Sequence, residues 1–236
     1  MERIDKIISS QSNFSRKEVR QMILRKRVTV DGQVVDKYDI KIDEKEKIIA
    51  IDGQAINLKK NIYLILNKPK GYISATEDKS QKTVLELVPE EFKKRELFPA
   101  GRLDKDTTGL MLITNDGIMA HNILSPRKHV KKIYEVVIDI DMTEKMVKGF
   151  LEGVKLSDAE CKAAELKITG KCSGIVTIRE GRYHQIKRMF GCFGAKVIEL
   201  NRIGIGNLIL PEDLKLGECR ELSHEELEKI QEKNSI

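Results

Sequence analysis

The segment of residues 15–35 constrains the fold more than any other part of the chain. Ser15 followed three residues later by Glu18 has the spacing of a helix-capping box, and apolar residues then recur at helical intervals. Directly after this helix, two β-branched runs flank Asp31-Gly32, a dipeptide typical of tight β-hairpins. A capped helix that runs into a hairpin predicts a small α+β domain, which further short strands near residues 40–42 and 48–51 complete as residues 1–56.

Residues 57–61 form a short polar linker, and residues 62–236 predict a second, larger domain. Its helices are scattered among its strands without a regular βαβ repeat, which favours a largely antiparallel mixed sheet flanked by helices and loops over a doubly wound fold. The fold class is therefore α+β. Strands are expected at residues 62–66, 110–114, 132–138, 174–179 and 196–200, and helices at residues 143–151 and 183–192.

Charge is distributed unevenly along the chain, whose formal net charge is +6. Residues 15–27 contain six bases and one acid, whereas residues 212–233 contain eight acids and four bases. The basic helix and hairpin have two interpretations: a surface that neutralises phosphates of a nucleic acid, or an ordinary solvated helix face.

Cysteine spacing and hydropathy exclude several classes of protein. The four cysteines are far apart, and none forms a Cys-x-x-Cys pair, so we expect reduced thiols and no zinc site. No apolar run approaches the ~18 residues of a membrane span, and the first residues are charged, without a signal-peptide core. These features predict a cytoplasmic protein.

The most informative stretch is residues 101–117. In it, a polar loop with glycines at both ends runs directly into an apolar strand. A carboxylate such as Asp104, held beside a rigid strand, can serve as a nucleophile, a base or a metal ligand. Three alternatives remain open from the residues alone. Asp104 and Asp106 could be a glycosidase pair, Asp116 could join them around magnesium, or the aspartates could only cap backbone amides.

The amino-terminal domain resembles the S4 RNA-binding domain over residues 2–52. The resemblance depends on Arg3-Ile4-Asp5-Lys6, on residues 14–20 and on Arg27-Val28-Thr29-Val30-Asp31-Gly32. This resemblance implies a small domain that binds structured RNA.

The larger domain resembles the RsuA-type pseudouridine synthases. Four segments agree in order: Leu66-Asn67-Lys68-Pro69-x-Gly71-Tyr72, the Gly101-Arg102-Leu103-Asp104 segment through Gly117, Lys131-x-x-Tyr134-x-Val136, and residues 180–190. The resemblance implies an enzyme that isomerises uridine in RNA to pseudouridine and requires no cofactor.

The same resemblance implies roles for individual residues. Asp104 would be the essential carboxylate, attacking C1′ of the ribose or taking a proton from C2′. Arg182 would pair with Asp104 and keep it ionised. Tyr134 would stack on the flipped uracil and accept the late proton from C5, Ile186 would supply an apolar contact, and His184 is interpreted as structural or RNA-contacting.

Ribosomal RNA is the expected partner of a monomeric protein that flips its target base. Tyr183-His184-Gln185 favours 16S RNA, with large-subunit RNA and a non-catalytic ribosome-assembly role as alternatives. The expected RNA-contacting residues are basic or polar and come from both domains: Arg3, Ser15, Arg16, Lys17, Arg20, Lys26, Arg27, Lys68, Arg102, Arg127, Lys128, Lys131, Lys132, Lys187 and Arg188.

Overall fold

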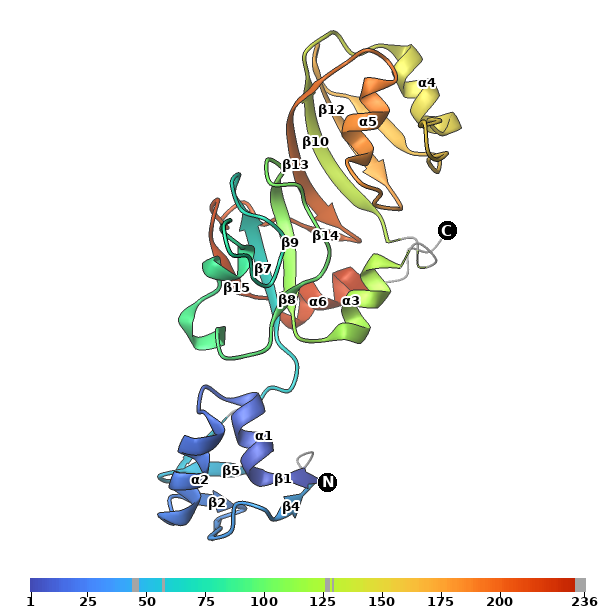
Figure 1. Ribbon diagram of the computed structural model, residues 1–236. Helices are drawn as coiled ribbons and strands as arrows, with labels where there is room; N and C mark the ends of the chain where they lie inside the picture. The colour runs from blue at the N-terminus through green and yellow to red at the C-terminus, as the bar shows by residue number, and fades with distance from the viewer. Residues whose placement is uncertain (44–46, 57, 126–127, 129, 232–236) are drawn as a thin grey trace. The chain divides into compact units, whose positions relative to one another are not determined.

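The computed structural model describes residues 1–43, 47–56, 58–125, 128 and 130–231. The chain forms two compact units, labelled by element in Figure 1. The first contains Met1–Ile62 and Glu90–Glu96, and the second contains Tyr63–Pro89 and Leu97–Ile236.

The first unit packs two helices, α1 (Ile4–Gln11) and α2 (Arg16–Leu24), against short strands around an isoleucine- and valine-rich core. One sheet has the order β3-β2-β5-β6, and a separate pair joins β1 to β4. The bounds are β1 Glu2–Arg3, β2 Val28–Val30, β3 Gln33–Val34, β4 Lys41–Ile42, β5 Ile49–Ile51 and β6 Gln54–Ala55, with a 3-10 turn η3 at Glu90–Phe92.

Local signals in this unit predicted its structure well. The Ser15 side chain accepts a hydrogen bond from the Glu18 amide, and the Glu18 carboxylate accepts one from the Ser15 amide, so the capping box is confirmed. Strands β2 and β3 pair in antiparallel register around Asp31 (φ 50°) and Gly32 (φ 80°), which confirms the hairpin. Both turn residues are left-handed, as a two-residue turn that matches the strand twist requires.

The second unit is built on a nine-stranded sheet, counted over the described residues, with the order β11-β12-β10-β13-β9-β7-β15. Strand β14 pairs with β13, and β8 with β9. Strands β9 and β13 run parallel and the other pairs are antiparallel, so the predicted mixed, largely antiparallel sheet is confirmed. The bounds are β7 Tyr63–Lys68, β8 Phe98–Pro99, β9 Thr108–Thr114, β10 Lys132–Ile138, β11 Glu165–Ile168, β12 Ser173–Ile178, β13 Val197–Ile205, β14 Leu208–Ile209 and β15 Cys219–Glu221.

Helices flank the two halves of this sheet (Figure 1). Helices α4 (Glu144–Glu152) and α5 (Gln185–Gly191) lie with β10 and β12, and α3 (Gly117–Leu124) and α6 (His224–Gln231) lie near β9 and β14. A 3-10 turn, η2, covers Val84–Leu87. Among the described residues, none of the helices is both long enough and apolar enough to cross a membrane.

The acidic carboxyl-terminal region, which matched no sequence motif, belongs to this unit. Strand β15 pairs with β7 at the edge of the sheet, and Ile230 of α6 is buried in the same core cluster as Leu110 and Leu112 of β9. A sequence signal for α6 was present, since Ser223 and Glu226 form a capping box.

Candidate active site

The loop that carries Asp104 is anchored from two sides. Lys68, at the end of β7, is fully buried, and its ammonium group donates hydrogen bonds to the carbonyl oxygens of Asp104 at 3.0 Å and Thr107 at 2.8 Å. Burial lowers the pKa of Lys68 to about 8. On the other side, the Ser74 hydroxyl donates to the Leu103 carbonyl at 2.8 Å and lies 2.9 Å from the Leu103 amide. These contacts fix the backbone on both sides of the Asp104 side chain.

The Asp104 carboxylate contacts a lysine and a histidine from the α5 region. The Lys187 ammonium lies 3.0 Å from Asp104 Oδ2, and the His184 Nε2 atom lies 3.4 Å from Asp104 Oδ1. Lys187 also contacts Asp106 at 2.6 Å. Burial would lower the pKa of Lys187, but hydrogen bonds to Asp106 and Asp104 raise it, so this lysine stays protonated between two carboxylates.

Lys187 occupies the place that the sequence assigned to Arg182, which corrects the expected pairing. The Arg182 side chain donates from Nε to Glu180 at 3.3 Å, and no ion pair joins Arg182 to Asp104 within the described part of the chain. The reason is local: α5 begins only at Gln185, so Lys187 lies in its first turn. Arg182 precedes the helix, in a segment where Gln185 accepts from the Arg182 amide and donates to Glu180.

Helix α5 also starts later than the expected residue 183, because His184 adopts a left-handed conformation with φ 48°. Such backbone is uncommon outside glycine. It places the His184 ring beside Asp104, stacked on the exposed Tyr183 ring with centroids 3.9 Å apart.

The two apolar site candidates lie on regular elements. Tyr134 is in the middle of β10, opposite Val176 of β12 and Arg202 of β13, and 7% of its surface is exposed. Ile186 is buried in the first turn of α5, adjacent to Lys187.

Arg202 is a buried residue that the sequence reasoning missed. Its Nε donates to the Leu110 carbonyl at 2.7 Å, whereas its Nη2 is buried without a hydrogen-bond partner among the described residues. Gly109 faces it across the parallel β9–β13 pair, and a Cβ at Gly109 would lie 2.3 Å from the Arg202 carbonyl oxygen. The sequence signal that could have indicated this residue is the position of Arg202 within a strand of alternating buried and partly exposed residues.

Two of the expected RNA-contacting lysines need correction. Lys68 and Lys132 are buried, with 0% and 7% of their surface exposed, because each begins or ends a central strand with its side chain in the interior. Burial, with a smaller contribution from Arg202, lowers the pKa of Lys132 to about 8. As placed, neither ammonium group can reach a phosphate.

The other expected RNA-contacting residues are at least partly exposed or lie outside the described residues. Arg27 pairs with Asp52 at 2.8 Å, Arg188 pairs with Asp158, and Ser15 caps α2. Arg127 lies outside the described residues. Exposed or partly exposed bases are Arg3, Arg16, Lys17, Arg20, Lys26, Arg102, Lys128 and Lys131.

The alternative carboxylate chemistries fit this geometry less well. The hydrogen bond from Lys187 lowers the pKa of Asp106, whereas the general acid of a glycosidase needs a raised pKa. Asp116 accepts from the Ile118 and Met119 amides as the cap of α3, and from the Tyr63 hydroxyl. In the described ranges, no group of three or more His, Cys, Asp or Glu side chains is arranged to hold a metal ion.

Comparison with known proteins identifies the family. Residues 62–191, more than half of the chain, match the family described as RNA pseudouridylate synthase, and residues 2–48 match the S4 domain. The chain belongs to the RNA pseudouridylate synthase family. It is therefore an isomerase that acts on RNA, and the predicted resemblances to the S4 domain and to the RsuA-type enzymes are confirmed.

Similarity to individual relatives extends over nearly the whole chain. The chain is 41% identical to the ribosomal small subunit pseudouridine synthase A of Yersinia pestis, over 97% of this chain and 97% of the relative. The enzyme of the same name from Escherichia coli (strain K12) is 40% identical over 97% of this chain and 99% of its own length. A crystal structure of a pseudouridylate synthase matches with a TM-score of 0.69 and 34% identity, covering 98% of this chain and 100% of that one.

Proposed function

We propose that this enzyme isomerises a specific uridine of ribosomal RNA, in the small subunit (16S), to pseudouridine in the cytoplasm. Relatives named for the small ribosomal subunit support the substrate, since they align along almost all of the chain. The observation that carries the proposal is Asp104, held on an anchored loop with Lys187 3.0 Å from its carboxylate.

The reaction breaks the bond between N1 of uracil and C1′ of ribose, and rejoins the turned base through C5. Asp104 acts as the essential carboxylate. It either bonds to C1′ and is displaced when C5 attacks that carbon, or takes a proton from C2′ and returns it when C5 adds to C1′ of the resulting glycal. Lys187, whose ammonium group lies 3.0 Å from this carboxylate, holds it in position through an ion pair. The proton on C5 leaves after the new bond forms, and N1 regains one.

Tyr134 and Ile186 would flank the uracil, with the tyrosine hydroxyl near the C5 proton. The target base must leave its stack, which costs a few kcal/mol. Phosphate contacts from exposed bases such as Arg102, Lys128 and Lys131 offset this cost, while the S4 domain, residues 1–56, holds the surrounding RNA fold.

Replacing the essential carboxylate tests the proposal. Asp104→Asn should lower turnover by at least ~10³-fold, because the amide is neither a nucleophile nor a base, while RNA binding persists. Release of tritium from [5-³H]uridine-labelled 16S RNA measures turnover. Asp106→Asn is the matched control, since the same substitution on the same loop also alters a Lys187 contact. Wild-type turnover of Asp104→Asn would contradict the mechanism.

The substrate is tested separately by mapping pseudouridine in both ribosomal RNAs from cells with and without this protein. Loss of one pseudouridine from 16S RNA is the expected result. Loss from large-subunit RNA would reassign the substrate, and no change in either would favour an assembly role without catalysis.

A further inference from the structure

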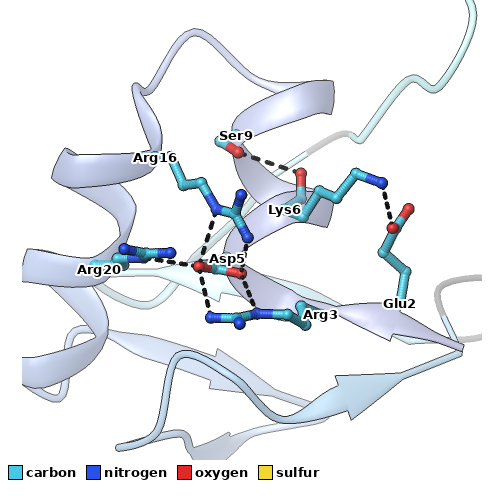
Figure 2. Close-up of polar contacts among 7 residues, drawn as sticks. All are labelled: Glu2, Arg3, Asp5, Lys6, Ser9, Arg16 and Arg20. Atoms are coloured by element: carbon cyan, nitrogen blue, oxygen red, sulfur yellow. Dashed lines mark hydrogen bonds and ion pairs between the residues drawn. The ribbon is translucent and has the colours of Figure 1, made fainter.

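One buried carboxylate in the first unit binds three arginine side chains (Figure 2). Asp5, in the first turn of α1, has no exposed surface. Arg3, Arg16 and Arg20 each donate from Nε to its oxygens, at 3.1, 3.1 and 2.8 Å. Burial alone would raise the pKa of Asp5, but hydrogen bonds from Arg16, Arg20 and Arg3 hold it well below its usual range.

The cluster carries an excess of positive charge at the surface. Three guanidinium groups surround one carboxylate, and their side chains remain 36%, 45% and 41% exposed. Arg3 and Arg16 each donate a second hydrogen bond from Nη2. Each of these two guanidinium groups therefore uses two of its five N–H donors for Asp5. Among the described residues, the remaining donors have no other hydrogen-bond partner, so they are available to an outside partner.

The aromatic ring of Tyr38 further restrains two of these groups. The Arg20 guanidinium carbon lies 5.0 Å from the ring centroid, and that of Arg3 lies 5.8 Å away. Both separations fall within the range of a cation–π interaction. Asp5 and Tyr38 together fix the orientation of the guanidinium planes before any partner arrives.

A purely structural ion pair would not require this composition. One or two arginines suffice to neutralise a buried carboxylate, and each additional guanidinium in the same place adds repulsion between like charges. The excess positive charge of the three guanidinium groups is neutralised when an anion with several acceptor oxygens binds to their exposed side. Guanidinium groups match phosphate oxygens in a forked geometry, which favours a phosphodiester backbone.

We propose that Asp5 is a positioning residue that presets Arg3, Arg16 and Arg20 as a clamp for the sugar–phosphate backbone of the RNA. The identity of the polyanion rests on the proposed function. Preformed arginines lose less side-chain entropy on binding, so the buried negative charge strengthens the attachment of RNA although it lowers the net charge.

The experiment compares two substitutions that remove the same charge from the same unit. Asp5→Asn releases the cluster, whereas Asp31→Asn removes an exposed carboxylate whose ion-pair partner, Lys47, is not among the expected RNA-contacting residues. Binding of the full chain to unmodified 16S RNA transcribed in vitro is measured by filter retention across KCl concentrations. We expect Kd to rise about 5- to 20-fold for Asp5→Asn, with a shallower salt dependence, and to stay equal or fall for Asp31→Asn.

A Kd for Asp5→Asn that is no higher than that of the control variant would overturn the proposal. Simple attraction between net charges predicts that both substitutions tighten RNA binding, so RNA binding by Asp5→Asn that is as tight as that by Asp31→Asn would exclude a positioning role.

A second variant decides the matter if Asp5→Asn unfolds the first unit, as far-UV circular dichroism and urea titration would reveal. Arg16→Lys keeps the charge but loses the fork, and should raise Kd several-fold with an unchanged fold. Wild-type Kd in Arg16→Lys overturns the proposal.

Kinetics separate this proposal from the proposed function. For Asp5→Asn, KM should rise while kcat changes less than twofold, and an effect on kcat alone would count against positioning. Absence of turnover in the wild-type chain would refute the proposed function and leave the binding comparison valid.

Discussion

At the scale of single residues, Lys187 is the cation that lies against Asp104, the proposed catalytic carboxylate. One ammonium group contacts Asp104 and Asp106, so it is held by two carboxylates of the anchored loop and in turn orients Asp104. In the proposed reaction, an Asp104 without this ion pair would rotate away from the sugar, and the cost would appear in the rate of the chemical step.

Removing this ammonium group should therefore be costly. Lys187→Met should lower kcat at least ~10²-fold, and Lys187→Arg should retain more activity because it keeps the charge. Arg182→Met is the comparison, since the structure pairs Arg182 with Glu180. Single-turnover kinetics on 16S RNA measure all three. A larger loss from Arg182→Met than from Lys187→Met would restore the pairing predicted from the sequence.

At the scale of elements, α6 shows how the acidic carboxyl-terminal region is attached to the sheet. Arg220 of β15 binds Glu226 with two hydrogen bonds, at 2.8 and 2.7 Å, and Glu226 also accepts from the Ser223 amide at 2.9 Å. One carboxylate thus caps the helix and links it to the edge strand that pairs with β7.

This carboxylate makes stability depend on pH. The hydrogen bond from Arg220 lowers the pKa of Glu226 to about 2, from an ordinary value of 4.5. The folded state therefore favours the charged form, and its contribution is complete above pH 4.5 and disappears as the pH falls from 4.5 to 2.

Glu226→Gln should cost about 1 kcal/mol at pH 7, and the difference from wild type should shrink toward pH 2. Urea unfolding at several pH values measures it, with the exposed neighbour Glu225→Gln as the control. A constant difference across this pH range would show that Glu226 does not act through its charge.

At the scale of the whole molecule, exposed bases on both units accompany a net charge of +6. Each phosphate they neutralise releases counterions, so RNA affinity should fall steeply with salt. We expect the Kd for 16S RNA to rise at least ~10-fold between 50 and 200 mM KCl. Filter binding checks this, and a Kd independent of salt would exclude a phosphate-dominated interface.

Local structure and family could be predicted from the order of the amino acids alone. The cap at Ser15, the hairpin at Asp31-Gly32 and the strand Lys132–Ile138 were predicted with nearly correct bounds. Each depends on backbone groups within a few residues, so neighbouring side chains are enough to specify it. The ordered motifs identified the family in the same way, because they are read along the chain.

Which charged groups pair with one another depends on long-range packing. Asp104 pairs with Lys187 and not with Arg182, and Lys68 and Lys132, which resemble RNA-binding lysines in the sequence, are buried beneath the surface. The partner of a charged side chain depends on where distant strands and helices place it, as when β7 brings Lys68 under the loop of residues 104–107. Burial and ion pairing are set by such long-range packing, which the spacing of residues along the chain does not contain.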